Sequence, residues 1–449
     1  MAQALAEGQA AQSAVAARRE SSGRTHWDRA STPGRLREVL AWLIVATVAW
    51  GGLATFTASQ HASGAGTVVS ASEPLSKDAL QLWQSLSDAN DAASAAILAG
   101  SLPPQAIVTR YQDDLATARD DIVDAARRGG PPGDLDTLST GLNSYSDEVS
   151  RALSNNLLGY PVGAAYLRQA SALMTNQLLP VAHALYTIED ARLAGASAQV
   201  TGLPLIVVTI VAGLALGVAY WRCGRWMYRH THRVFNPGLL LAATAGAVAI
   251  LWLAGACLAG RSDLLTAQAQ GTTPVTALAS ADIAVLKAHS YEALTLINNS
   301  GNDSNEADFQ AERTALGPAP GSLLTIAQRD AIGSPGAAPA TAALTAAPAW
   351  FAQHQVVRDD DNGDNPAVAG GGTHQQAVAL VVSGASGRAF QALSADLTGA
   401  ITADNAAFAA HAQAGQRAFA GLEPGVIVAT LAMAAALAWG LSRRLAEYR

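Results

Sequence analysis

The sequence contains little cysteine and little charge for its length. Only two of its 449 residues are cysteine and only 14% are charged, whereas half are hydrophobic. Cys223 lies at the edge of one apolar run and Cys257 lies inside another, so the long polar segments contain no cysteine and must be stabilised by packing rather than by disulfides. Alternating β-branched runs, which would indicate strands, are also few. This composition favours an all-helical membrane protein over a soluble enzyme.

The sequence also lacks the motifs of well-known enzymes. It contains no nucleotide-binding Gly-Lys motif, no kinase catalytic loop, no His-Glu-x-x-His zinc motif and no nucleophile elbow. His230 and His232 are separated by one residue, but two ligands are too few for a metal, and the four nearby arginines oppose cation binding. We therefore expect no enzymatic activity, no cofactor and no metal.

The acidic stretch RDDDNGDN at 358–365 does not fit a calcium loop. An EF-hand loop has glycine at its sixth position, so Gly363 would place Arg358 at the first ligand position and Ala369 at the twelfth. An arginine cannot supply the carboxylate that the first position requires. We interpret 358–365 as the turn before the last helix, where Asp, Asn and Gly are favoured, with an ion site as the alternative.

Four runs without a charged residue are long enough to cross a membrane. A hydrocarbon core of roughly 30 Å needs about 20 helical residues. The runs are 39–57, 203–221, 238–260 and 424–442. The first run could be a signal peptide, because small residues follow it, but the 38 residues before it are more than an ordinary signal has. We expect four transmembrane helices and an uncleaved first anchor.

The distribution of charge predicts the orientation of these helices. Lys and Arg are in excess in the short segments 1–38, 222–237 and 443–449, which contain six, four and three of them. Segments 58–202 and 261–423 each contain fifteen Asp plus Glu and have net charges of −7 and −8. Because positive segments stay in the cytoplasm, we expect a multi-pass plasma-membrane protein with both termini cytoplasmic. The two acidic segments are then extracytoplasmic, and nucleic acid is excluded as their partner.

The two long segments share a pattern that indicates an internal repeat. DAASAAILAG at 91–100 and EALTLINNSG at 292–301 each begin with an acid and end with glycine, and an aromatic residue follows each. Later in each segment an aromatic residue lies sixteen residues before a proline. The aromatic residues are Tyr111 and Phe309, then Tyr145 and Trp350, and the prolines are Pro161 and Pro366. We interpret the segments as duplicates, with chance similarity between Ala-rich helices as the alternative.

Apolar residues three and four apart predict that both segments are helical. In the first segment they indicate helices at 75–99, 107–126 and 135–158, and a long one from 162 into the second span. We expect two tandem helical bundles whose first and last helices continue into the membrane. The stretch 317–385 is rich in Gly and Pro and is expected to contain long loops. The tail 1–38 is polar and is expected to be disordered.

Several phrases of the sequence resemble the GlnX family. They are GYPVGAAYLRQASALMTNQLLPVAHALY at 159–186, EALTLI at 292–297 with DFQ at 308–310, and WFAQHQVVRDDDNGDNPAV at 350–368. GlnX is the transmembrane component of an actinobacterial amino-acid sensing system, and the similarity covers nearly the whole chain. The resemblance implies a receptor that is engaged by a glutamate- or aspartate-binding lipoprotein and signals to the soluble serine/threonine protein kinase G. The sequence departs from the family at 358–365 and in its glycines at 370–372, and these differences concern partner specificity.

Two groups of residues are candidates for contacts with partners. Contacts with an extracytoplasmic protein are assigned to Tyr166, Arg168, Glu292, Asp359, Asp360 and Asp364. Contacts on the cytoplasmic side, with anionic lipid or an acidic protein face, are assigned to Arg225, Trp226, Tyr228, Arg229, His232 and Arg233. The alternatives are solvent exposure or core packing for the first group, and membrane anchoring alone for the second.

Other functions stay open at this stage. A stand-alone chemoreceptor-like sensor would bind a small ligand directly in its helical bundles, and an envelope scaffold would bind none. A transporter is disfavoured, because the spans contain no ionisable residue to mark a pathway. Gly213 and Gly217 form a pair of small residues one helical turn apart, which is compatible with a homodimer or with close packing inside one chain.

Overall fold

The computed structural model describes residues 32–231, 236–298 and 304–446, and all regular elements in these ranges are helices. The prediction of an all-helical protein is therefore confirmed. The described residues form two compact units, which we treat separately. The span unit comprises the described residues of 1–63, 202–260 and 417–449. The bundle unit comprises those of 64–201, its first segment, and 261–416, its second segment.

Four helices are long and apolar enough to cross a membrane, which confirms a multi-pass membrane protein. They are Arg37–Leu98, Val162–Arg229, Pro237–Asn298 and His374–Gly440, and each overlaps one of the four predicted runs. In the span unit, the apolar parts belong to α2 (Thr32–Thr67), α8 (Pro204–Thr231), α9 (Pro237–Ala267) and α16 (Leu422–Ala446). The orientation of the termini stays a prediction.

Polar groups and small residues fix the packing within the span unit. Trp50 Nε1 of α2 donates a hydrogen bond to the Thr209 carbonyl oxygen of α8 at 3.1 Å, and the Thr57 and Thr209 hydroxyls lie 2.7 Å apart. Gly213 lies against Trp50 and the side chain of Ile250, so a Cβ atom there would overlap both. Gly213 therefore packs inside one chain, and the alternative of a dimer contact is not needed to explain it.

Helix α8 is longer than the predicted span 203–221, because it continues to Thr231 through most of the short segment 222–237. The stretch 222–231 contains one glycine and no proline, so no residue there stops the helix. Helix α9 starts at Pro237, a residue that suits a first helical position, and the Asn236 side chain accepts a hydrogen bond from the Gly238 amide at 3.1 Å. The connection between the two helices is accordingly short.

The helices of the first bundle segment begin and end close to the predicted positions. They are α3 (Glu73–Leu98), α4 (Gln105–Arg127), α5 (Pro132–Leu157), α6 (Val162–Leu173) and α7 (Leu179–Thr201), with the short π-helices η1 (Val68–Ser72) before α3 and η2 (Met174–Leu178) before α7. Periodicity located these helices, but it did not reveal the π-helices, because five residues of wider turn leave the apolar pattern almost unchanged.

The second bundle segment is more helical than expected. Its elements are η3 (Gln268–Thr272), α10 (Thr273–Asn298), α11 (Ser304–Leu316), α12 (Leu323–Asp330), α13 (Ala337–Asn362), α14 (His374–Val382) and α15 (Ala385–Ala418). The expectation of long loops in 317–385 was wrong for most of that stretch. Pro339 falls in the first turn of α13, where proline is tolerated, and α13 also accommodates Pro348. The connection 363–373 is the one long loop within 317–385.

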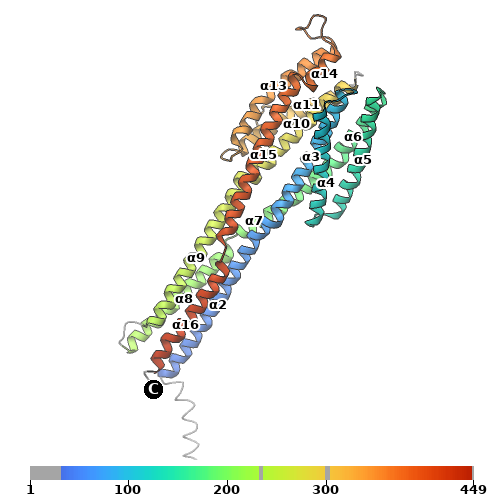
Figure 1. Cartoon of the computed structure of the whole chain (residues 1–449). Coiled ribbons are helices and arrows are strands. Elements are labelled where there is room, and N and C mark those ends of the chain that lie inside the picture. The colour runs from blue at the N-terminus through green and yellow to red at the C-terminus, as the bar shows by residue number, and fades with distance from the viewer. Residues whose placement is uncertain (1–31, 232–235, 299–303, 447–449) are drawn as a thin grey trace, which may run out of the picture. The chain divides into compact units, whose positions relative to one another are not determined.

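One hydrophobic core joins the two bundle segments. Helices α3 and α10 pack against each other, and residues of both segments belong to the same buried cluster (Figure 1). The aromatic residues Tyr145 and Trp350 are both fully buried in it. Helices α3 and α10 bury residues on most of their faces, so each needs partners from the other segment. The described residues of both segments therefore form one compact unit, and the internal repeat stays a prediction.

Candidate functional site

Polar side chains of α3 and α10 meet inside the core of the bundle unit. The Asn90 amide Nδ2 donates to Ser290 Oγ at 3.0 Å, and the Ser94 and Ser290 hydroxyls lie 3.1 Å apart. Asp91 of α3 forms a buried hydrogen bond and ion pair with Nδ1 of His289 on α10. Burying such groups is unfavourable unless they are paired, so these contacts specify how the two segments fit together.

An arginine on α4 extends this contact within the first segment. Arg110 forms ion pairs with Asp88 and with Asp91, the latter at 3.2 Å, and it lies 3.9 Å from Asp114. Burial and the negative charge of Asp88 raise the pKa of the Asp114 carboxyl to about 7, although the positive charge of Arg110 acts to lower it. Three carboxylates thus share one guanidinium, which makes the local charge sensitive to protonation.

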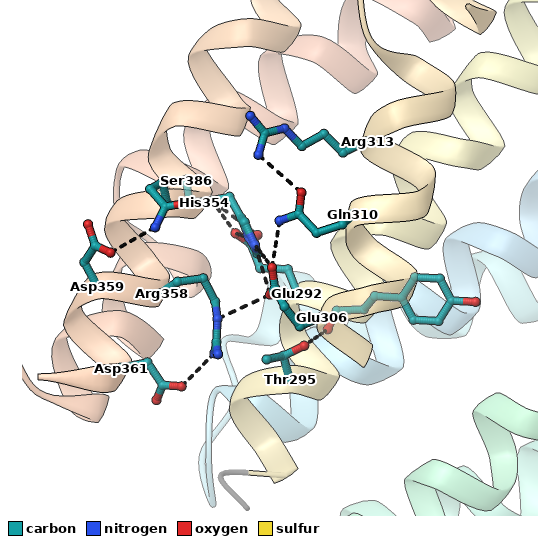
Figure 2. A network of polar contacts seen from close by, with 12 residues as sticks. Glu292, Thr295, Glu306, Gln310, Arg313, His354, Arg358, Asp359, Asp361 and Ser386 are labelled. Atoms are coloured by element: carbon teal, nitrogen blue, oxygen red, sulfur yellow. Dashed lines mark hydrogen bonds and ion pairs between the residues drawn. The ribbon is translucent and has the colours of Figure 1, made fainter. Parts of the chain in front are cut away.

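The second segment also contains a buried carboxylate. Glu292 of α10 is 1% exposed, and its Oε1 atom lies 2.9 Å from His354 Nδ1. Ser386 of α15 donates from its hydroxyl to the same oxygen at 3.0 Å. The His354 ring stacks on Phe309 with 3.5 Å between the ring centres. Figure 2 shows these side chains converging from α10, α13 and α15 on one buried position.

From His354 the polar contacts continue toward the end of α13 (Figure 2). His354 Nε2 lies 3.2 Å from Glu306 Oε2 of α11, and Arg358 Nε lies 3.3 Å from the same oxygen. Arg358 also pairs with Asp361 at 2.9 Å, and Asp361 is 2.7 Å from Nδ1 of His374 at the start of α14. The chain of contacts therefore reaches from the core to the 363–373 loop.

The histidine and glutamate in this chain of contacts shift each other's protonation. Burial acts to lower the pKa of His354, but its hydrogen bonds to Glu292 and Glu306, with the charges of these two carboxylates, together outweigh burial and raise the pKa above the usual value. Burial acts to raise the pKa of Glu306, but the hydrogen bonds from His354 and Gln310 and the positive charges of His354 and Arg358 together outweigh burial and lower the pKa. These shifts favour an imidazolium that donates from both nitrogens to two carboxylates.

We call the connected set the charged network. It consists of Asp88, Asp91, Arg110, His289, Glu292, Ser386, His354, Glu306, Arg358, Asp361 and His374. The two parts of the network meet on α10, where His289 and Glu292 lie one turn apart and interact through the negative charge of Glu292 rather than through a hydrogen bond. The network thus runs from the first segment through α10 to the start of α14.

The predicted contact residues in the second segment have different environments. Glu292 belongs to the charged network, and Asp360 is also buried, where it accepts a hydrogen bond from Asn365 Nδ2 at 2.6 Å. Asp359 is half-buried and accepts from Gln355 at 2.9 Å, whereas Asp364 is exposed. Of these acids, Asp364 offers the most accessible surface to a docking protein.

The first-segment candidates lie close to the second segment. Tyr166 is half-buried and packs against the shared core. Arg168 is exposed and donates to Asn298 Oδ1, at the end of α10, at 2.9 Å. The structure therefore gives Arg168 a contact across the two segments, which the sequence did not indicate.

The predicted cytoplasmic contact residues lie on the last turns of α8, as far as they are described. Arg225 is exposed and its guanidinium lies 5.7 Å from the centre of the Trp221 ring. Trp226 is half-buried, whereas Tyr228 and Arg229 are exposed. His232 and Arg233 lie outside the described residues. An arginine beside aromatic rings at the end of an apolar helix is typical of a membrane interface.

Sequence reasoning missed most of the charged network, including Arg110, His289 and His354. A signal was present, because Trp350 and His354 lie four residues apart and so share one face of a helix. A polar residue at a position that the apolar pattern assigns to the core indicates a buried partner elsewhere in the fold. The identity of that partner depends on long-range packing.

A cavity of about 290 Å³ lies at the end of the bundle unit where α3 and α10 both finish. Ile97 and Leu98 of α3 line it together with Leu296 and Ile297 of α10. Residues of the α5–α6 loop and of α14 complete the lining, among them Tyr160, Pro161, His374 and Val378. Because His374 also belongs to the charged network, the network ends at this cavity.

The first bundle segment matches a known family of domains. Residues 64–198 match the model of an actinobacterial sensor domain, a range that covers nearly all of the first bundle segment. Comparisons with curated proteins and with solved structures gave no match. Together with the four apolar helices, the family match supports a membrane protein with a sensing role, of a kind found in actinobacteria.

Proposed function

We propose that this protein is a transmembrane signal-transduction protein that relays the extracellular availability of glutamate or aspartate to a cytoplasmic serine/threonine protein kinase. A binding lipoprotein senses the amino acid and docks on the bundle unit. The observation that carries the proposal is the match of residues 64–198 to an actinobacterial sensor domain. The amino acid, the lipoprotein and the kinase come from the resemblance to GlnX. In this proposal the chain has no enzymatic activity and no cofactor.

Charge supports the proposed orientation. The bundle unit comes from the two acidic segments, whereas arginines lie at the ends of the apolar helices, as Arg225 and Arg229 do on α8. Placing the positive segments in the cytoplasm puts the bundle unit outside and both termini inside. A soluble partner in the periplasm can then reach the bundle unit.

The charged network supplies a way to couple docking to the spans. It links the first segment to α10 and α15, and the chain continues from α10 through η3 into α9, as it does from α3 through η1 into α2. A buried network has few alternative arrangements, so a docked partner can favour one packing of α3 against α10 over another. Coupling energies of about 1–3 kcal/mol are sufficient for such a shift.

The internal repeat is part of the proposal. Near the start of both bundle segments, a five-residue π-helix is followed by a helix of 26 residues, α3 or α10. Later in each segment another 26-residue helix, α5 or α13, buries an aromatic residue, Tyr145 or Trp350. These correspondences support a duplication that produced two related helical bundles.

A genetic experiment tests the proposed function. Deleting the gene is expected to abolish the increase in phosphorylation of the kinase substrate that follows addition of glutamate or aspartate, and the full-length chain is expected to restore it. A Glu292→Gln variant that reaches the membrane in normal amounts is expected to restore less, because Gln presents an amide where His354 and Ser386 meet a carboxylate. An unchanged phosphorylation response in the deletion strain would contradict the proposal.

A second candidate function is direct binding of a small ligand to the bundle unit. The cavity at the ends of α3 and α10 favours it, because His374 and Tyr160 lie on its lining. Titrating glutamate or aspartate into the full-length protein in lipid nanodiscs, without any lipoprotein, distinguishes the two candidates. Saturable heat of binding would favour a stand-alone sensor, and its absence together with lipoprotein binding would favour the relay.

A further inference from the structure

A cavity of about 490 Å³ lies in the apolar part of the span unit. Helices α8 and α9 form most of its lining, and Trp50 of α2 and Met433 of α16 contribute from the two other helices of this unit. The volume falls within the roughly 300–1,000 Å³ of pockets that hold small molecules. The proposed relay gives this cavity no role.

The cavity lies between two close contacts of α8 with α9. A Cβ atom at Gly213 would lie 2.7 Å from the Ile250 side chain, and one at Gly224 would lie 3.6 Å from the Leu239 side chain. Between these contacts, a Cβ atom at Gly217 would meet no neighbouring heavy atom within 4 Å. Small residues one turn apart usually let membrane helices approach each other closely. At Gly217 the missing side chain instead leaves room for another molecule.

The cavity offers apolar surface to its occupant. The described residues that line it include no charged side chain. Trp50 and Tyr220 bring polar atoms to the lining, but both atoms are bonded within the protein. The Trp50 Nε1 atom donates to the Thr209 carbonyl oxygen at 3.1 Å, and the Tyr220 hydroxyl lies 2.6 Å from that of Thr47. An apolar occupant therefore leaves these groups satisfied, whereas a polar ligand would lose its own hydrogen bonds to water.

The cavity is open toward the surroundings of the span unit, which are lipid in a membrane protein. Leu214 and Val218 of α8 and Leu251 of α9 line it, and each is more than half exposed. The lining on α8 extends from Gly213 to Trp221, which is about 12 Å at 1.5 Å per residue. One leaflet of a hydrocarbon core of roughly 30 Å is about 15 Å deep. The cavity therefore suits an acyl chain of one leaflet in both length and chemistry.

Arginines lie at one end of the cavity. Trp221 lines this end, and the Arg225 guanidinium lies 5.7 Å from the centre of the Trp221 ring. Arg222, next to Trp221 in the chain, is exposed. The stretch 222–237 contains four arginines and no Asp or Glu. This charge complements an anionic headgroup, and arginines beside aromatic rings are typical of the depth at which lipid phosphates lie.

We propose that an anionic phospholipid binds between α8 and α9, with one acyl chain in the cavity and its phosphate at Arg225. The lipid comes from the leaflet on the side of the arginines, whichever side of the membrane that is. The inference is independent of the proposed relay, because it rests on the span unit alone. A lipid that binds the folded protein in this way stabilises the packing of α8 against α9.

Native mass spectrometry of the full-length protein tests this inference. The protein is released from vesicles of equal parts phosphatidylglycerol and phosphatidylcholine, and the unaltered chain is expected to retain phosphatidylglycerol in preference. Gly217→Phe is expected to lower the retained phosphatidylglycerol more than about tenfold, because the ring fills the space of the acyl chain. The matched control is Gly255→Phe. A Cβ atom at Gly255 on α9 also meets no heavy atom within 4 Å, but Gly255 does not line the cavity.

A second variant tests the headgroup and keeps the inference testable if Gly217→Phe does not fold. Arg225→Gln leaves the cavity open and is expected to remove the preference for phosphatidylglycerol over phosphatidylcholine. Arg443→Gln is the matched control. The Arg443 guanidinium lies 5.1 Å from the centre of the Trp439 ring on α16, a similar arrangement, but Trp439 does not line the cavity.

Thermal unfolding in detergent provides an independent readout. Added phosphatidylglycerol is expected to raise the melting temperature of the unaltered protein, because a ligand of the folded state stabilises it. The same addition is expected to leave the melting temperature of Gly217→Phe unchanged.

Three outcomes would overturn the inference. Equal retention of the two lipids by the unaltered protein would show only an unselective layer of lipid around the spans. Undiminished phosphatidylglycerol on a folded Gly217→Phe variant would place the lipid outside the cavity. A dimer of the unaltered protein without retained lipid, which Gly217→Phe abolishes, would assign the cavity to a helix of a second copy. None of these outcomes affects the proposed relay.

Discussion

Asp121 on α4 illustrates how burial sets the properties of single carboxylates in the bundle unit. Its side chain is 7% exposed, and among the described residues Oδ2 has no hydrogen-bond partner. Burial, with a smaller contribution from the negative charges of Asp78 and Asp124, raises the pKa of Asp121 to about 7. A carboxyl with this pKa binds a proton in the folded protein at pH values where the unfolded chain has lost it.

The shifted pKa of Asp121 predicts a pH dependence of stability. Because the folded pKa is above the unfolded value of 3.8, the folded state is favoured at low pH and loses this contribution as pH rises through about 7. Asp121→Asn is expected to raise the melting temperature of the full-length protein in detergent at pH 8 and to change it little at pH 4. Exposed Asp120→Asn is the control. Parallel melting curves for the unaltered protein and Asp121→Asn at all pH values would contradict the prediction.

The predicted contact residues show how far single positions can be interpreted from sequence. The repeat drew attention to Glu292, and the structure gives Glu292 a central place in the charged network instead of a surface position. Glu292 lies three residues after His289 and four before Leu296, so the three residues share one face of the helix. His289 and Leu296 are both buried, which indicates that this face points into the core. Its partners His354 and Ser386 are 62 and 94 residues away, and no local pattern specifies them.

Individual helices pack closely where glycine permits it. Gly271 of η3 faces α15, and a Cβ atom at this position would lie 3.0 Å from Phe408 Cα and closer still to its side chain. Gly399, within α15, has no heavy atom within 4 Å of the same hypothetical position. Gly271 therefore allows a close helix contact that a larger residue would prevent, whereas Gly399 makes no such contact, although both lie inside helical elements.

Substituting these two glycines by alanine is expected to change stability in opposite directions. Gly271→Ala forces η3 away from the α15 backbone and should destabilise by about 1–3 kcal/mol, the range for overpacking. Gly399→Ala meets open space and should stabilise by about 0.5–1 kcal/mol, because alanine has the higher helix propensity. Thermal unfolding of the full-length variants followed by circular dichroism measures both. Equal effects of the two substitutions would show that η3 does not pack as described.

At the scale of the whole molecule, orientation in the membrane determines which partners can meet the bundle unit. The predicted orientation rests on the arginines in the short segments 1–38, 222–237 and 443–449 and on the excess of acidic residues in 58–202 and 261–423. Exposed positions in each bundle segment, Gly133 and Ile332, offer sites for labelling, as does exposed Arg229 on α8.

Labelling of intact cells tests the orientation. In a background with Cys223→Ser and Cys257→Ser, a membrane-impermeant maleimide is expected to label Gly133→Cys and Ile332→Cys but not Arg229→Cys. Permeabilised cells provide the control, in which all three variants should react. Labelling of Arg229→Cys alone in intact cells would reverse the topology and remove the bundle unit from contact with a periplasmic lipoprotein.

The sequence by itself determined the four apolar helices, the helical class and most helix positions in the first bundle segment. These properties depend on composition and on apolar spacing within a few turns, which are local. Only the tertiary structure decided that α3 and α10 share one core, that Asp91 pairs with His289, and that a cavity lies where α3 and α10 end. These features join residues as much as 200 positions apart, and which buried polar group meets which partner depends on the packing of every helix between them.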